Sequence, residues 1–90
     1  MGLVYRVNKE KVASRTINAE AVLLNLENGF YYSLNKTGSE IWGFIEEGKG
    51  SQDIVEFLAT KHGIDKKKAE KDFFTLIKDL EKEGLICKKC

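Results

Sequence analysis

The fold of this chain is decided by residues 21–45, AVLLNLENGFYYSLNKTGSEIWGFI. This stretch reads as two apolar strands joined by a turn at 27–29, and it continues directly into a helix. The residues before it form one further strand, and the residues after it form two further helices. The pairing of the two strands therefore determines which side chains face the core.

The length of the turn sets the register of these two strands. A two-residue turn at Asn28-Gly29 would mix apolar and polar residues on each face. A three-residue turn with Gly29 in the left-handed region gives one continuous apolar face, and we expect this register. It pairs Leu26 with Phe30, Leu24 with Tyr32 and Val22 with Leu34, and it leaves Leu23, Asn25, Tyr31 and Ser33 on the opposite face.

Length and composition indicate one domain over 1–90, with a core of about 11–86. Apolar residues make up 42% of the chain and charged residues 32%, which is typical of a globular protein. The net charge of +1 is low for a protein that holds nucleic acid mainly through its phosphates. No apolar run has the length of a signal peptide or a membrane span, so we expect a cytoplasmic protein that does not bind membranes.

The strand before the central stretch covers 11–17, and 18–20 turns the chain into the next strand. The result is a three-stranded antiparallel meander, while residues 1–10 show no clear period and are expected to form an arm. The third strand, 30–34, lies at an edge and contains neither charge nor proline. Edge strands normally carry such guards. Either another part of the domain covers this edge, or a partner pairs with it.

Three helices are expected after the sheet. Thr37 and Glu40 have the spacing of a capping box at the first helix, Ser51 can cap the second, and Asp65 can cap the third. Gly63 supplies a left-handed residue at the end of the second helix. The apolar stripe of the third helix consists of Ala69, Phe73, Leu76, Ile77 and Leu80. The predicted fold class is α+β, with a winged helix-turn-helix-like order of a three-stranded antiparallel sheet followed by three helices.

The sequence offers little support for catalysis or metal binding. A closed zinc site needs four ligands, whereas the chain has only Cys87, Cys90 and His62 as thiol and imidazole ligands. A thiol or dimer-bridging metal role for the two cysteines stays as a minor alternative. Gly43, Gly48 and Lys49 match part of a phosphate-binding loop, but no strand precedes them and Gly50 replaces the hydroxyl residue. We predict no enzyme activity, no metal and no cofactor.

Two binding functions remain. An extended peptide can add to the unguarded edge as a fourth strand, beside a groove lined by Tyr31 and Phe74, which lie outside the predicted apolar faces. The rival is a winged-helix regulator that binds DNA through the lysines of the third helix. That helix has six lysines against six acids over 65–83, and it lacks the arginine, asparagine and glutamine side chains that most often read bases. We therefore expect no nucleic-acid partner.

The order and spacing of several short motifs resemble the PqqD family over about 12–86. The motifs are Ala21-Val-Leu-Leu-Asn-Leu, Gly29-Phe-Tyr-Tyr-Ser-Leu-Asn35, Thr37-Gly38, Ile41-Trp42, Asp72-Phe73, Leu76-Ile77, Leu80 and Gly84-Leu85-Ile86. The resemblance implies a peptide chaperone that holds the leader of a ribosomally made precursor between its third strand and third helix. It also implies presentation to a modifying enzyme, often a radical S-adenosylmethionine (radical SAM) enzyme.

Carried over by position, the resemblance implies a set of peptide-binding residues. They are Phe30, Tyr31, Tyr32, Ser33 and Leu34 on the strand, with Phe74 and Ile77 as the groove wall. Asn35 and Asp72 look structural, as a helix-entry residue and a polar group that pins the fold. The terminal Cys-x-x-Cys lies outside the shared pattern.

Overall fold

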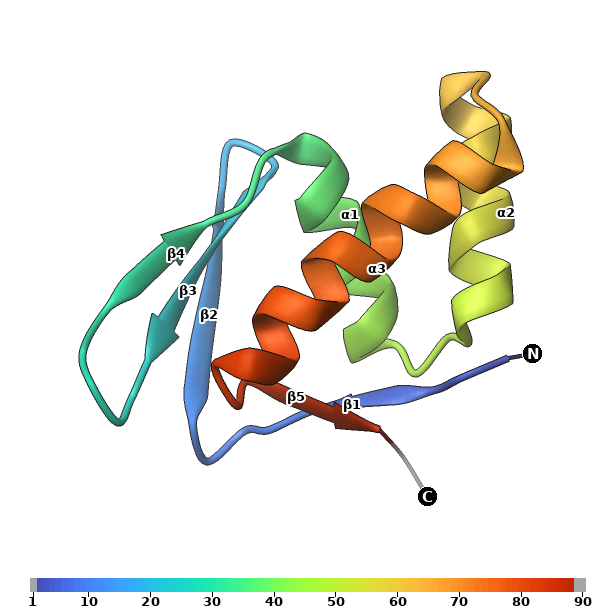
Figure 1. Ribbon diagram of the computed structural model, residues 1–90. Coiled ribbons are helices and arrows are strands. Elements are labelled where there is room, and N and C mark those ends of the chain that lie inside the picture. The colour runs from blue at the N-terminus through green and yellow to red at the C-terminus, as the bar shows by residue number, and fades with distance from the viewer. Residues whose placement is uncertain (1, 89–90) are drawn as a thin grey trace.

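A computed structural model describes residues 2–88 and shows an α+β fold (Figure 1). Two antiparallel sheets are present, one with the strand order β2-β3-β4 and one formed by β1 and β5. The three helices follow the three-stranded sheet in the chain, as predicted. The elements are β1 Tyr5–Val7, β2 Val12–Ile17, β3 Glu20–Asn25, β4 Tyr31–Ser33, α1 Lys36–Glu46, α2 Ser51–His62, α3 Lys66–Lys82 and β5 Ile86–Lys88.

The three-stranded sheet is the predicted meander, with β2 and β4 at its edges. A two-residue turn joins β2 to β3, because Ile17 pairs with Glu20. Both turn residues, Asn18 and Ala19, have positive φ values, of 53° and 66°. Asparagine adopts this region readily, whereas alanine does so rarely. The tight turn therefore places a small strain on Ala19.

The predicted register of β3 and β4 is wrong by one residue. The strands pair Val22 with Ser33, Leu23 with Tyr32 and Leu24 with Tyr31. The turn is longer than expected because Asn25 lies buried at its base, 2% exposed, and its Oδ1 accepts hydrogen bonds from the amides of Glu27 and Asn28. Gly29 has the predicted positive φ, 78°.

This shift turns the predicted faces of β3 over. Ala21, Leu23 and Asn25 are buried, whereas Val22 and Leu24 are only partly buried on the outer face. On β4 the alternation is as expected, since Tyr32 packs against the core and Tyr31 is exposed. A slip of one residue moves every side chain of a strand to the other face.

The N-terminal segment is a strand and not the expected arm. Tyr5–Val7 pairs antiparallel with Ile86–Lys88, so the C-terminal segment also forms a short strand. Tyr5 is 3% exposed and its ring contacts the ring of Phe73 edge-to-face, at 6.2 Å between centroids. In Figure 1 β1 and β5 lie side by side below the lower ends of α1 and α3, where they close the core.

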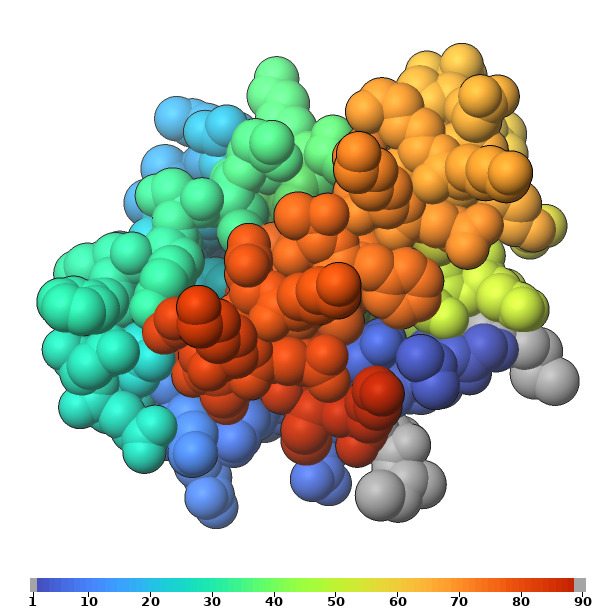
Figure 2. All heavy atoms as spheres, in the orientation of Figure 1, coloured from blue at the N-terminus to red at the C-terminus, as the bar shows by residue number. Residues whose placement is uncertain are grey.

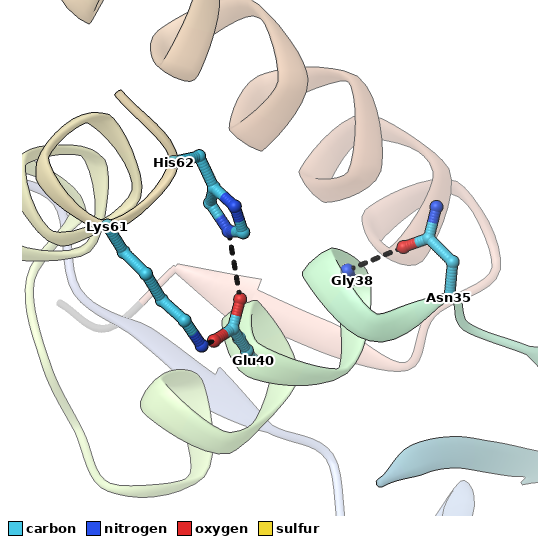
Figure 3. Close-up of polar contacts among 5 residues, drawn as sticks. All are labelled: Asn35, Gly38, Glu40, Lys61 and His62. Carbon is cyan, nitrogen blue, oxygen red and sulfur yellow. Dashed lines mark hydrogen bonds and ion pairs between the residues drawn. The ribbon is translucent and has the colours of Figure 1, made fainter. Parts of the chain in front are cut away.

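Two helix starts differ from the expected caps. Asn35, not Thr37, caps α1, with its Oδ1 accepting from the amide of Gly38 at 2.8 Å (Figure 3). Glu40 does not complete a capping box, because it forms an ion pair with Lys61 and a hydrogen bond with His62 of α2, the latter at 3.2 Å. These contacts tie the middle of α1 to the end of α2.

The start of α2 also differs from the prediction, because its cap residue is Gly50. Ser51 is instead buried in the first turn, where its hydroxyl accepts from the amide of Leu3 at 3.0 Å. Gly63 ends α2 in the left-handed conformation, as predicted.

The helix α3 begins after Asp65, the predicted cap position, although no side-chain cap bond forms there. Its buried stripe consists of Ala69, Phe73, Ile77 and Leu80, while Leu76 is only partly buried. In Figure 1 α3 crosses between the meander and α2. Leu76 lines the same hollows as Ser33 and Leu34, so it lies on the side of α3 that borders β4.

Candidate functional site

The outer edge of β4 presents unpaired backbone groups. Asn25 N–H donates to Phe30 C=O at 2.9 Å, and Leu34 N–H donates to Ala21 C=O at 2.8 Å. In an antiparallel ladder only alternate residues bond to a given neighbour, so Tyr32 is the next residue of β4 that faces β3. The N–H and C=O groups of Tyr31 and Ser33 therefore point outward.

No strand among residues 2–88 pairs with this edge, because β4 is the last strand of its sheet. The three residues of the strand carry no charge. The sequence left open whether another part of the domain covers this edge or a partner pairs with it, and among the described residues no strand covers it. The edge has the form of a site for an added strand.

A groove lies between this edge and α3. It consists of two adjoining hollows, of about 450 Å³ and about 510 Å³, that share Ser33, Leu34, Leu76 and Asp79. Figure 2 shows it as a crease between the teal atoms of β4 and the orange atoms of α3. Its further lining residues are Tyr31, Tyr32, Asn35, Thr37, Gly38, Ile41, Asp72, Thr75, Leu80, Lys82, Glu83 and Leu85.

One side-chain bond links the two walls of the groove. The hydroxyl of Tyr32 on β4 donates to a carboxylate oxygen of Glu83, just after α3, at 2.5 Å. The hydrogen bond to Glu83, together with partial burial and the negative charge of Glu83, raises the pKa of Tyr32 above its ordinary value. The protonated hydroxyl thus links β4 to the residue after α3 at this end of the groove.

The other end of the groove is fixed through α1. The Ser39 hydroxyl accepts from the amide of Ala21 at 2.6 Å and donates to the carbonyl of Leu34 at 3.2 Å. A Cβ built on Gly38 would lie 3.3 Å from Leu34 and from the capping oxygen of Asn35. The chain thus packs closely where β4 leads into α1, and these contacts hold this end of the edge in place.

Most of the predicted strand residues lie in the groove, whereas the predicted wall residues do not. Tyr31, Tyr32, Ser33 and Leu34 all line the groove. Phe30 is 65% exposed at the β3–β4 turn and does not line either hollow. The contact of these residues with a peptide stays a prediction.

Phe74 and Ile77, expected to form the wall, lie elsewhere. Ile77 is 1% exposed and belongs to the core. Phe74 packs edge-to-face on Phe73 and lines a separate hollow with Leu3 and Val55. Four of the five predicted stripe residues are buried, and the exception is Leu76. Without the position of β4, the sequence did not show which flank of α3 faces the sheet.

The wall is instead formed by Asp72, Leu76, Asp79 and Glu83. These positions are separated by four, three and four residues, so they lie on one side of the helical path. This spacing was the available signal, and it was hidden because Leu76 also fits the core stripe.

The remaining chemical candidates give no second site. Cys87 lies 3.8 Å from the guanidinium of Arg6, and its predicted partner Cys90 lies outside the described residues. His62 is engaged with Glu40. Residues 2–88 contain no cluster of three potential metal ligands. In the same range, every helix is too short or too polar to cross a bilayer.

Comparison with known proteins agrees with this architecture. Residues 20–86 match the family model described as coenzyme PQQ synthesis protein D (PqqD). A comparison with curated protein sequences gave no match.

Two solved structures share the fold. One is described as TbiB1 in complex with the TbiA(beta) leader peptide, with 32% identity, a TM-score of 0.83, and coverage of 90% of this chain and 93% of that one. The other is described as lasso peptide synthetase B1 complexed with the leader peptide. It has 24% identity, a TM-score of 0.84, and coverage of 92% and 96%. Because the family model matches residues 20–86, which are well over half of the sequence, the chain belongs to the PqqD family.

Proposed function

We propose that this protein binds the leader segment of a ribosomally made precursor peptide as a fourth strand along β4. The observation that carries the proposal is the pair of residues, Tyr31 and Ser33, whose backbone groups face outward beside a groove. Main-chain hydrogen bonds would supply affinity, and the groove would select alternate side chains of the guest.

The relative with 32% identity supports this proposal, because its structure is described as a complex with a leader peptide. Charges, proline and a paired neighbour protect an edge strand from strand addition, and the edge of β4 has none of these among the described residues. The contacts of Ser39, Asn35 and Tyr32 hold the edge rigidly, which lowers the entropy lost on binding.

Presentation to a modifying enzyme completes the proposed role. The bound leader would leave the rest of the precursor free for that enzyme, and a radical SAM enzyme is the partner class we propose. The protein itself would contribute binding and no chemical step. Because precursor peptides are made by ribosomes, we place this function in the cytoplasm.

The groove gives no support to the alternative of a DNA-binding regulator. The side of α3 that lies along the groove carries Asp72 and Asp79, which would repel phosphates. Salt separates the two functions experimentally. Phosphate binding weakens steeply as salt rises, whereas main-chain pairing is much less sensitive.

The proposal is tested by titrating isotope-labelled protein with a candidate leader peptide encoded beside it. We expect amide signals of Tyr31 and Ser33 to shift and their hydrogen exchange to slow, because these amides become bonded to the guest. Amides of β2, at the other edge of the sheet, serve as the internal control. Signals that move on β2 or α2 while β4 stays unchanged would show that the peptide binds elsewhere.

A further inference from the structure

The charge of the groove indicates the chemistry of its guest. The β4 wall is uncharged, while the α3 wall and the residue after it carry three acids, Asp72, Asp79 and Glu83, against one lysine, Lys82. In the half of the groove nearest α1, the charged lining residues are both acids, namely Asp72 and Asp79. A guest with an acidic residue facing this wall would meet like charge along most of its length.

The three acids differ in how far they are already paired. Asp72 lies 3.6 Å from Lys68 one turn earlier, and Glu83 accepts the Tyr32 hydroxyl. Asp79 is exposed, and its carboxylate forms no ion pair with any cation of residues 2–88. It is also the one acid that borders both halves of the groove. A cation supplied by the guest would therefore be most favoured at Asp79.

An apolar contact lies next to this acid. Leu76 precedes Asp79 by three residues, which is about 4.5 Å along the helix axis. It is partly buried and also borders both halves of the groove. In an added strand every second side chain faces α3, at a spacing of about 6.8 Å. Two successive α3-facing side chains of a guest can thus reach Leu76 and Asp79 respectively.

From this arrangement we infer that the guest segment carries an apolar residue that packs on Leu76 and, two positions away, a Lys or Arg that pairs with Asp79. The inference rests on the proposed function, because the guest must first add to β4 for this spacing to apply. It names the side chains that select the guest, whereas the free backbone edge accepts any extended peptide.

A display library of random twelve-residue peptides tests the inference and does not require the natural guest. The library is sorted against the wild type, Ser33→Pro and Asp79→Lys at moderate salt. We expect wild-type binders to lose binding to Ser33→Pro and to contain the apolar-x-basic pattern. For a synthetic binder, changing the basic residue to Gln should weaken affinity about threefold to fivefold, as expected for a partly exposed ion pair.

Three variants of acidic residues test whether the charge of Asp79 selects the basic residue of the guest. Asp79→Lys should select acidic residues at the position where the wild type selects basic ones, and Asp79→Asn should lose the preference without reversing it. Glu70→Lys is the matched control, because it makes the same charge change beside the Phe74 hollow. It should keep the wild-type preference. Fluorescence of the buried Trp42 confirms that each variant is folded.

Each result separates the inference from the function on which it rests. Binders that depend on Ser33 but lack the basic residue, or that keep it against Asp79→Lys, would overturn the inference alone. A library that yields no binder sensitive to Ser33→Pro would overturn the proposed function and the inference together.

Discussion

Replacing Ser33 with proline should abolish most of the proposed peptide binding and leave the fold intact. The amide of Ser33 points away from β3, so proline removes a donor that no described strand uses. Proline is tolerated at such edge positions. Tyr32→Pro is a poorer test, because the amide of Tyr32 faces β3 and its loss would weaken the sheet itself.

The size of the effect follows from the lost bond and from the bulk of the proline ring. One main-chain hydrogen bond contributes about 0.5–1.5 kcal/mol net, and the guest carbonyl left without a donor adds about 1–3 kcal/mol if it stays buried. The ring also occupies space that the added strand would use. A total of roughly 1.5–4.5 kcal/mol corresponds to a Kd about 10 to 2,000 times higher.

The assay is fluorescence anisotropy of a labelled candidate leader peptide, with urea unfolding followed through Trp42 as the check on folding. Thr16→Pro is the matched control. Since Leu26 N–H donates to Lys11 C=O, alternation along β2 places the Thr16 amide outward on the opposite edge. Thr16→Pro should bind the peptide like the wild type. Equal affinity of folded Ser33→Pro and wild type would refute strand addition at β4.

Three predictions concern stability. Asn25→Ala should lower the free energy of unfolding by about 1–3 kcal/mol, because it leaves two turn amides without their acceptor, as urea unfolding would show. A loss below about 0.5 kcal/mol would mean that the side chain does not hold the turn. Asn35→Ala should cost about 1 kcal/mol through the lost cap, whereas Thr37→Ala should cost clearly less; a similar cost for both would contradict the assigned cap. Partial burial alone would raise the pKa of Glu40, but hydrogen bonds from Lys61 and His62 hold it below its ordinary value. Because the folded pKa is lowered, this stabilisation is present above the unfolded pKa and is lost as pH falls through the folded pKa. Thermal melts should therefore show Glu40→Gln to be less stable than wild type by about 0.5–1 kcal/mol at neutral pH, with the difference disappearing in acid. A difference that does not change with pH would argue against the ion pairs.

Local sequence patterns determined the elements and the class of fold. The two strands within 21–34, the stripe of 69–80 and the helix end at Gly63 depend on neighbours within a few residues, so they can be predicted without a structure. The unguarded composition of 31–33 is of the same kind, and it pointed to the edge that now carries the proposed function. The order of strands followed from short connections, since a meander is the simplest pairing of consecutive strands.

Only the tertiary structure decided the register, the closure of the core and the groove wall. Asn25 was expected on the face opposite the core, yet its side chain is buried. Hydrogen bonds from two turn amides offset the cost of burying it, and the register of β3 and β4 differs by one residue from the prediction. Tyr5 joins the core only because β1 meets β5, more than 75 residues away in the chain. Leu76 and Asp79, not Phe74 and Ile77, face β4, because the helix packs with Phe73 and Ile77 inward and turns Phe74 toward α2. Each of these outcomes depends on contacts between segments that are distant in the chain. The local pattern of residues does not predict which of these contacts form or how much free energy they contribute.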